Sequence, residues 1–205
     1  LAVAFNEVHM VGVRDSKRLA LKESIQEETP DVKVEISTRA DKYLEDMDVI
    51  VTATSAGGGK SVIDIMRVKP GCIITDVARP LDLTAEDVAK RPDVLVIESG
   101  EILLPGENVE MRDIGLPPKV AYVCLAETIV LALEGRFEIF TIGREIEWQK
   151  VKEIYKLGLK HGMRLAAISG INGVYSDADI AEVARLAKAA REGHDPVKMK
   201  QQSAV

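Results

Sequence analysis

The chain has 205 residues, a net charge of −6 at pH 7, 46% hydrophobic residues and 29% charged residues. This composition is typical of a globular protein, and the length suits one large domain or two small ones. Because the charge balance is acidic and only 4% of the residues are aromatic, we expect neither the basic face nor the base-stacking platform of a nucleic-acid binder.

The apolar runs and the cysteines argue against two further classes of protein, those that span a membrane and those that bind a metal through cysteines. Every apolar run is far shorter than the ~20 residues of a membrane helix, so no membrane span is expected. Cys72 and Cys124 lie far apart and follow no metal-ligand spacing, and we predict no metal site. Without a visible signal peptide, we expect reduced thiols in a cytoplasm.

Short apolar runs alternate with helical segments in the first half of the chain. The periodicity predicts strands at residues 8–13, 32–36, 49–53, 72–75 and 94–97, and an amphipathic helix at residues 16–28. The later strands are almost continuously apolar, as in parallel sheets that are covered on both faces. We therefore predict an α/β fold, a Rossmann-like doubly wound parallel sheet with right-handed crossovers.

The second half is richer in helix. Helices are predicted at residues 120–133, 145–161 and 177–191, with loops at residues 101–118 and 169–176. We divide the chain into a partial dinucleotide-binding domain at residues 1–118, a helical region at residues 119–192 that packs on it, and a flexible tail at residues 193–205.

In an open parallel sheet, ligands bind beyond the carboxyl ends of the strands. Arg14, Ser16, Lys17 and Arg18 follow the first predicted strand, at the start of a helix. Three cations and a hydroxyl at that place suit the 2′-phosphate of an adenosine ribose, and they favour NADP over NAD. The alternative is a solvated helix start.

Three later strand ends supply the other predicted cofactor contacts, which are Thr54, Ser55, Ala56, Asp76 and Gly100. Small residues after the strand at residues 49–53 let a flat cofactor pass close to the backbone. The other two ends lie where a nicotinamide ring would rest.

The segment at residues 54–61 has two alternative interpretations. It could be a flexible turn, or a phosphate loop that ends in Gly59-Lys60-Ser61. The phosphate-loop pattern fails at its opening glycine, where this chain has Thr54.

The chain lacks the G-x-G-x-x-G fingerprint of a dinucleotide fold. In such a fold, a first strand, a glycine-rich turn and a first helix hold the pyrophosphate. We expect residues 1–5 to be the last turn of that helix, with the preceding ~30 residues, the length of a strand–turn–helix unit, outside this chain.

Cys124 lies in the very apolar segment at residues 120–133, and Glu127 is the only charged residue there. A cysteine in such a helix often only packs. Glu127 shares its helix face; an ionised carboxylate would raise the pKa of the thiol, whereas a protonated one could donate a proton. The residues alone leave two alternatives open, inert packing and a catalytic pair made of Cys124 and Glu127.

The sequence Val-Cys-Leu-Ala-Glu-Thr-Ile-Val-Leu-Ala-Leu-Glu-Gly at residues 123–135 resembles the cyanobacterial-type long-chain acyl-[acyl-carrier-protein] reductases, which form aldehydes. Gly143-Arg144, Lys160-His161-Gly162 and residues 13–19 and 71–76 are similar to the same family. The sheet more distantly resembles the NADP-binding domains of shikimate dehydrogenase and glutamyl-tRNA reductase. The resemblance covers about residues 1–165.

This resemblance implies an NADP-dependent oxidoreductase of fatty acid metabolism. In the family, a cysteine at the position of Cys124 accepts the fatty acyl group as a thioester, and NADPH reduces the thioester to an aldehyde. The implied partners are an acyl thioester of acyl carrier protein or coenzyme A, and the apolar helix could also serve a homo-oligomer. The alternatives are an oxidoreductase of another carbonyl substrate, like shikimate dehydrogenase, and a non-catalytic nucleotide-binding module.

Overall fold

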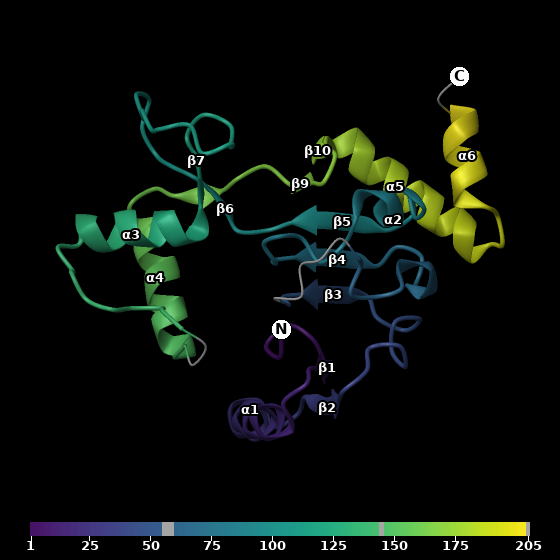
Figure 1. The fold of residues 1–205 in the computed structure, drawn as a ribbon, viewed down its shortest axis with the longest axis horizontal. Helices are drawn as coiled ribbons and strands as arrows, with labels where there is room; N and C mark the ends of the chain where they lie inside the picture. Colours follow the sequence, from purple (N-terminus) through teal and green to yellow (C-terminus); the bar gives the residue numbers. More distant parts are fainter. Residues whose placement is uncertain (55–59, 144–145, 204–205) are drawn as a thin grey trace. The chain divides into compact units, whose positions relative to one another are not determined.

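The computed structural model describes residues 1–54, 60–143 and 146–203 (Figure 1). Its helices are α1 (Asp15–Glu28), α2 (Ala85–Ala89), α3 (Val123–Leu133), α4 (Trp148–Lys160), α5 (Asp177–Arg191) and α6 (Pro196–Ser203), with a 3₁₀ turn at Ile65–Arg67. Its strands are β1 (Glu7–Val11), β2 (Lys33–Ser37), β3 (Val49–Thr52), β4 (Ile73–Asp76), β5 (Leu95–Glu98), β6 (Glu101–Leu103), β7 (Val120–Tyr122), β8 (Arg164–Leu165), β9 (Ser169–Gly170) and β10 (Gly173–Val174). These elements confirm the predicted α/β class.

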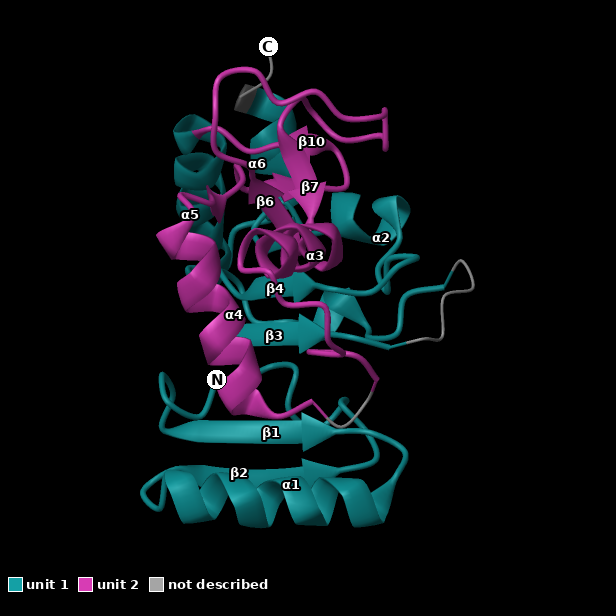
Figure 2. Cartoon of the chain, turned by 90° about the vertical axis from the view of Figure 1, so that its left-hand side faces the viewer, with its two compact units in different colours: residues 1–97, 177–205 teal, residues 98–176 magenta. Residues whose placement is uncertain are grey.

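The chain forms two compact units, which are coloured separately in Figure 2. Unit 1 consists of residues 1–97 and 177–205, and unit 2 consists of residues 98–176. The domain boundaries expected from the sequence stay a prediction.

Unit 1 is built on parallel strand pairs. β1 pairs with β2 along five residues, and β3 pairs with β4 along four residues. β5 lies on the other side of β4, where the amide of Leu95 donates to the carbonyl of Cys72 at 3.1 Å. Within the described residues, β1 has only β2 as a neighbour and β3 has only β4, so each keeps one uncovered edge.

The core of unit 1 surrounds β4 and one face of α5. Ile74 of β4 and Leu186 of α5 are both 0% exposed. Close approach before β4 requires Gly71, which has a φ of +85° and at which a Cβ would lie 3.2 Å from the Cβ of Ala187. The guanidinium of Arg191 donates to the carbonyl of Pro70 at 2.8 Å, which fixes the end of α5 to the same turn.

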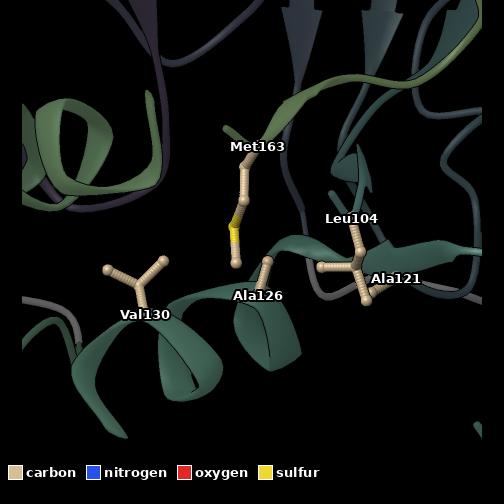
Figure 3. Packing of buried hydrophobic residues seen from close by; sticks show 5 residues of the cluster. All are labelled: Leu104, Ala121, Ala126, Val130 and Met163. Carbon is tan, nitrogen blue, oxygen red and sulfur yellow. The ribbon is translucent and has the colours of Figure 1, made fainter. Parts of the chain in front are cut away.

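Unit 2 has a small core between α3 and the strands around it. β6 pairs antiparallel with both β7 and β8, and β9 pairs antiparallel with β10. The side chains buried together are Leu104, Ala121, Ala126, Val130 and Met163 (Figure 3). α3 therefore buries the face that carries Ala126 and Val130.

The structure corrects the sequence prediction at several places, one of which is the predicted loop at residues 101–118, because it begins with strand β6. Val120–Tyr122 is a strand and not the start of a helix, because it pairs with β6 and buries Ala121 completely. The predicted loop at residues 169–176 contains the short strands β9 and β10. Within the expected flexible tail, residues 196–203 form α6, which begins where the carboxylate of Asp195 accepts the amides of Val197 and Lys198. The flexibility of the tail stays a prediction.

The strands are joined by short elements, and their pairing is mixed. β3 and β4 are joined through a 3₁₀ turn, and β4 and β5 through the five-residue helix α2. Glu98 at the end of β5 pairs antiparallel with Ser169, so parallel and antiparallel pairing both occur. Among the described helices, none combines the length and the apolar character needed to cross a bilayer.

A buried ion pair generates the first testable prediction. Arg91 forms a bidentate pair with Asp93, with distances of 2.9 and 2.7 Å, and it also donates to the carbonyl of Ile65 at 2.7 Å. Asp93 is 1% exposed. Arg91→Met leaves that carboxylate buried without its cation, and we expect the free energy of unfolding in urea to fall by about 3–5 kcal/mol.

The matched control is Arg39→Met. Arg39 also forms a pair with Asp41, at 2.7 Å, but its side chain is 76% exposed. We expect this loss to be below ~1 kcal/mol. Equal losses in the two variants would contradict the role given to Arg91.

Candidate functional site

Asp76 ends β4 and organises the loop that follows it. Its Oδ2 accepts the amides of Asp82 and Leu83 at 2.8 and 3.0 Å, and its Oδ1 accepts the amide of Ala78 at 3.1 Å. The residue is 2% exposed. The carboxylate predicted to contact a cofactor is thus engaged by the backbone of its own loop.

Asp82 joins this loop to the loop that follows β3. Its Oδ2 accepts the amide of Thr54 at 2.7 Å, and its Oδ1 accepts the Thr54 hydroxyl. Its carbonyl accepts the amide of Val62 at 2.9 Å, and the residue is 1% exposed. The carboxyl ends of β3 and β4 are therefore held together by two buried carboxylates, Asp76 and Asp82, which we call the aspartate clasp.

Sequence reasoning missed Asp82. Its acceptor role depends on Thr54, which lies 28 residues earlier in the chain. The sequence contains one indication of this role, because Asp82 lies six residues after Asp76, in the turn that follows a strand.

The cations predicted to hold a 2′-phosphate lie around the start of α1. Arg14 is the N-cap residue, and Arg14, Ser16 and Lys17 are exposed. Arg18 is 9% exposed, and its guanidinium donates to the carbonyls of Gly12 and Ser37 and pairs with Asp15. Arg18 therefore connects the ends of β1 and β2.

The remaining residues predicted to contact a cofactor are Ser55, Ala56 and Gly100. Ser55 and Ala56 lie outside the described residues, as does the glycine run at residues 57–59. Gly100 belongs to unit 2, has a φ of +93° and accepts the amide of Val123 through its carbonyl at 2.7 Å.

Cys124 and Glu127 lie on α3 in unit 2. Cys124 is exposed, so packing in the described core does not account for it. The carboxylate of Glu127 accepts the amide of Thr141 at 3.2 Å and the Thr141 hydroxyl. Glu127 thus fixes the segment near residue 141 to α3, and the catalytic roles of Cys124 and Glu127 stay predictions.

His161 is the residue that caps the end of α4. Its Nε2 lies 2.5 Å from the carboxylate of Glu134, which also accepts from Lys160 at 2.7 Å. The hydrogen bonds from Lys160 and His161 lower the pKa of Glu134. This cluster ties α4 to the end of α3.

Two grooves open on unit 1. One, of about 540 Å³, is lined by Lys60 together with the acidic residues Asp64, Glu86 and Asp87. The other, of about 690 Å³, is lined by residues of β1 and β3 and by residues of the segments next to them in the chain. We call the second one the interstrand groove.

Comparison with known proteins shows a partial similarity to a much longer protein. No protein-family model matches the chain. Over 120 residues, the chain is 39% identical to aminotransferase PigE of Serratia sp. (strain ATCC 39006). The match covers 56% of this chain and 13% of PigE, so the chain spans a small part of that relative's length.

This match corrects the expected activity. The relative is named an aminotransferase, and the resemblance to acyl-[acyl-carrier-protein] reductases is therefore wrong as an assignment of family. Three expectations that depended on this resemblance are also wrong. They are the reduction of a fatty acyl thioester, the oxidoreductase class and NADP as the cofactor.

The aspartate clasp generates a prediction about stability. Asp76→Asn puts an amide group where a carboxylate accepts three backbone amides. We expect a loss of about 2–4 kcal/mol in the free energy of unfolding, because hydrogen bonds to a buried charged group are lost.

Asp48→Asn is the control for this substitution. Asp48 accepts from Lys69 at 2.6 Å, but its side chain is 77% exposed, and we expect a loss below ~1 kcal/mol. If Asp76→Asn were as mild as Asp48→Asn, the clasp would not hold the two loops.

The two cysteines are expected to differ in reactivity. Burial raises the pKa of the Cys72 thiol to about 12, and the residue is 1% exposed. With iodoacetamide at pH 8, we expect alkylation of Cys124 in the folded protein and of Cys72 only after denaturation. Peptide mapping by mass spectrometry measures this order, and earlier labelling of Cys72 would contradict the burial.

Proposed function

We propose that this chain is one domain of a larger enzyme that is related to aminotransferases and transfers an amino group. The observation that supports the proposal is the 39% identity over 120 residues with aminotransferase PigE. Because the chain spans 13% of that relative, we assign the transfer of the amino group to the whole enzyme and not to these residues alone.

Aminotransferases use pyridoxal phosphate, which supplies an aldehyde that takes up the amino group and an electron sink for the substrate carbanion. A site for this cofactor needs a lysine whose amine loses its proton readily, an acidic partner for the pyridine nitrogen and donors for the phosphate. These requirements can be compared with the described residues.

The described lysines do not meet the first requirement, because none of them is buried. Hydrogen bonds from Lys33 to Glu7 and Glu35 raise the pKa of Lys33 above its ordinary value. The carboxylates of Asp87 and Glu86 likewise raise the pKa of Lys90. Such lysines are held as ammonium groups, whereas only a neutral amine attacks an aldehyde.

The phosphate requirement is not met either. The aspartate clasp places two buried carboxylates at the carboxyl ends of β3 and β4, where they would repel a phosphate. The groove beside Lys60 is lined by three acidic residues. The described lysines, the aspartate clasp and the groove beside Lys60 therefore do not fit pyridoxal phosphate, and we derive no catalytic step through it in this chain.

The parallel strands of unit 1 support a finer proposal about the fold. We propose that β1 to β5 are part of a doubly wound sheet. The parallel pairing of β1 with β2 and of β3 with β4 supports it, and so does the common direction of these four strands in Figure 2.

The test uses the native polypeptide that contains residues 1–205. It is incubated with pyridoxal phosphate, reduced with borohydride and mapped by mass spectrometry for the modified lysine. Transfer of an amino group from an amino acid to an aldehyde or ketone is measured in parallel. We expect transamination, and we expect the pyridoxyl-lysine to lie outside residues 1–205.

Two results separate the parts of this proposal. Absence of transamination with any amino donor would contradict the enzyme class. A pyridoxyl-lysine within residues 1–205 that disappears in a variant such as Lys60→Arg would contradict the placement of the cofactor outside this domain.

A further inference from the structure

The uncovered edge of β3 presents backbone groups that point away from β4. Alternate residues of a strand direct their N–H and C=O groups to the same side. The carbonyls of Asp48 and Thr52 accept the amides of Ile73 and Val77 at 3.0 and 2.9 Å, on the side of β4. Val49 and Val51 therefore direct their backbone groups to the opposite side.

The uncovered edge of β1 follows the same alternation. The carbonyl of Asn6 accepts the amide of Lys33 at 2.9 Å, and the amide of Gly12 donates to the carbonyl of Ser37 at 3.1 Å, both on the side of β2. Glu7, His9 and Val11 therefore direct their backbone groups away from β2.

These two edges border the interstrand groove. Side chains of β1 and of β3 line it together, and its volume is about 690 Å³. Figure 2 shows β1, β2, β3 and β4 running in the same direction. A space between two strands of the same direction, each with one unpaired edge, has the hydrogen-bond pattern that a further parallel strand needs.

The exposure of the bordering strands is unusual for a parallel sheet. Parallel strands are normally buried on both faces, and Ile74 of β4 is 0% exposed. In contrast, Val51 of β3 is 43% exposed and Val11 of β1 is 46% exposed. Apolar side chains of β1 and β3 such as Val11 and Val51 therefore favour burial, but the described residues leave them exposed.

We propose that the interstrand groove is the docking site of an extended apolar β-strand, which runs parallel to β1 and β3 and hydrogen-bonds to both. The strand comes from polypeptide outside residues 1–205. It joins the two strand pairs into one continuous parallel sheet, in the order β2, β1, docked strand, β3, β4, β5.

Two observations favour that source. The chain spans 13% of aminotransferase PigE, so a relative of this chain carries much additional polypeptide. Leu1 is 63% exposed and lines the same groove, so a segment joined there would begin beside the docking site. Main-chain pairing along two edges also distinguishes a strand from a small apolar ligand, which would leave the backbone groups unpaired.

The test is hydrogen–deuterium exchange, measured by mass spectrometry on residues 1–205 and on the native polypeptide that contains them. The amides that border the groove, at residues 9, 11 and 51, are expected to exchange quickly in the 205-residue chain. In the native polypeptide they are expected to exchange about a hundredfold more slowly, or slower still, because a docked strand protects them. The amides of β4 serve as the control and should be protected in both.

Two outcomes would overturn the proposal. Fast exchange of these amides in both proteins would mean that no strand occupies the groove. Protection in the 205-residue chain that grows with protein concentration would mean that a second copy fills the groove.

A pair of proline variants provides an independent readout. Val51→Pro removes an amide that faces the groove, whereas Ile50→Pro removes one on the side of β4. Proline is tolerated on an uncovered strand edge and not between paired strands. We expect Val51→Pro to lower the melting temperature of the native polypeptide strongly and that of the 205-residue chain weakly, with Ile50→Pro lowering both strongly. Equal, weak effects of Val51→Pro in the two proteins would contradict the docked strand.

Discussion

A strand in the interior of a parallel sheet needs hydrogen-bond partners along both of its edges, and this requirement governs unit 1. β4 meets it with β3 and β5, and it carries the fully buried Ile74. Within the part of the chain that the structure describes, β1 and β3 meet it on one edge only. Burying a backbone group without a partner costs about 1–3 kcal/mol, so the two uncovered edges must be either solvated or paired. The interstrand groove exists between these two edges.

The aspartate clasp keeps the carboxyl ends of β3 and β4 in place while the groove is open. Its hydrogen bonds connect residues 54 and 62 to residues 76–83. None of these bonds involves β1 or β2, so the loops beyond β3 and β4 are organised by their own strand pair. The carboxylate oxygens of Asp76 and Asp82 already accept hydrogen bonds from their own loops. Because both groups are buried carboxylates, an anionic cofactor does not suit this part of the chain.

The sequence predicted the elements that have a clear periodicity and missed those that depend on distant partners. The strands from β1 to β5 and the bounds of α5 follow from apolar runs and from turn residues, which are local signals. The segment at residues 120–133 is apolar throughout, so its division into β7 and α3 depends on pairing with β6 and could not be recognised locally. Arg18 has the chemistry of a phosphate ligand, but its tertiary position directs it to the carbonyls of Gly12 and Ser37.

The functional prediction failed for a related reason. The motifs around Cys124 resembled a reductase, whereas the chain is 39% identical over 120 residues to a protein that is named an aminotransferase. The same sequence analysis expected a strand, a turn and a helix outside the chain. This expectation stays a prediction.

The most direct measurement is an experimental structure of the native polypeptide that contains residues 1–205. Our account predicts one additional strand between β1 and β3, parallel to both and hydrogen-bonded to the backbone of residues 9 and 51. A structure in which β1 and β3 pair with each other, or in which water alone fills the space between them, would contradict it.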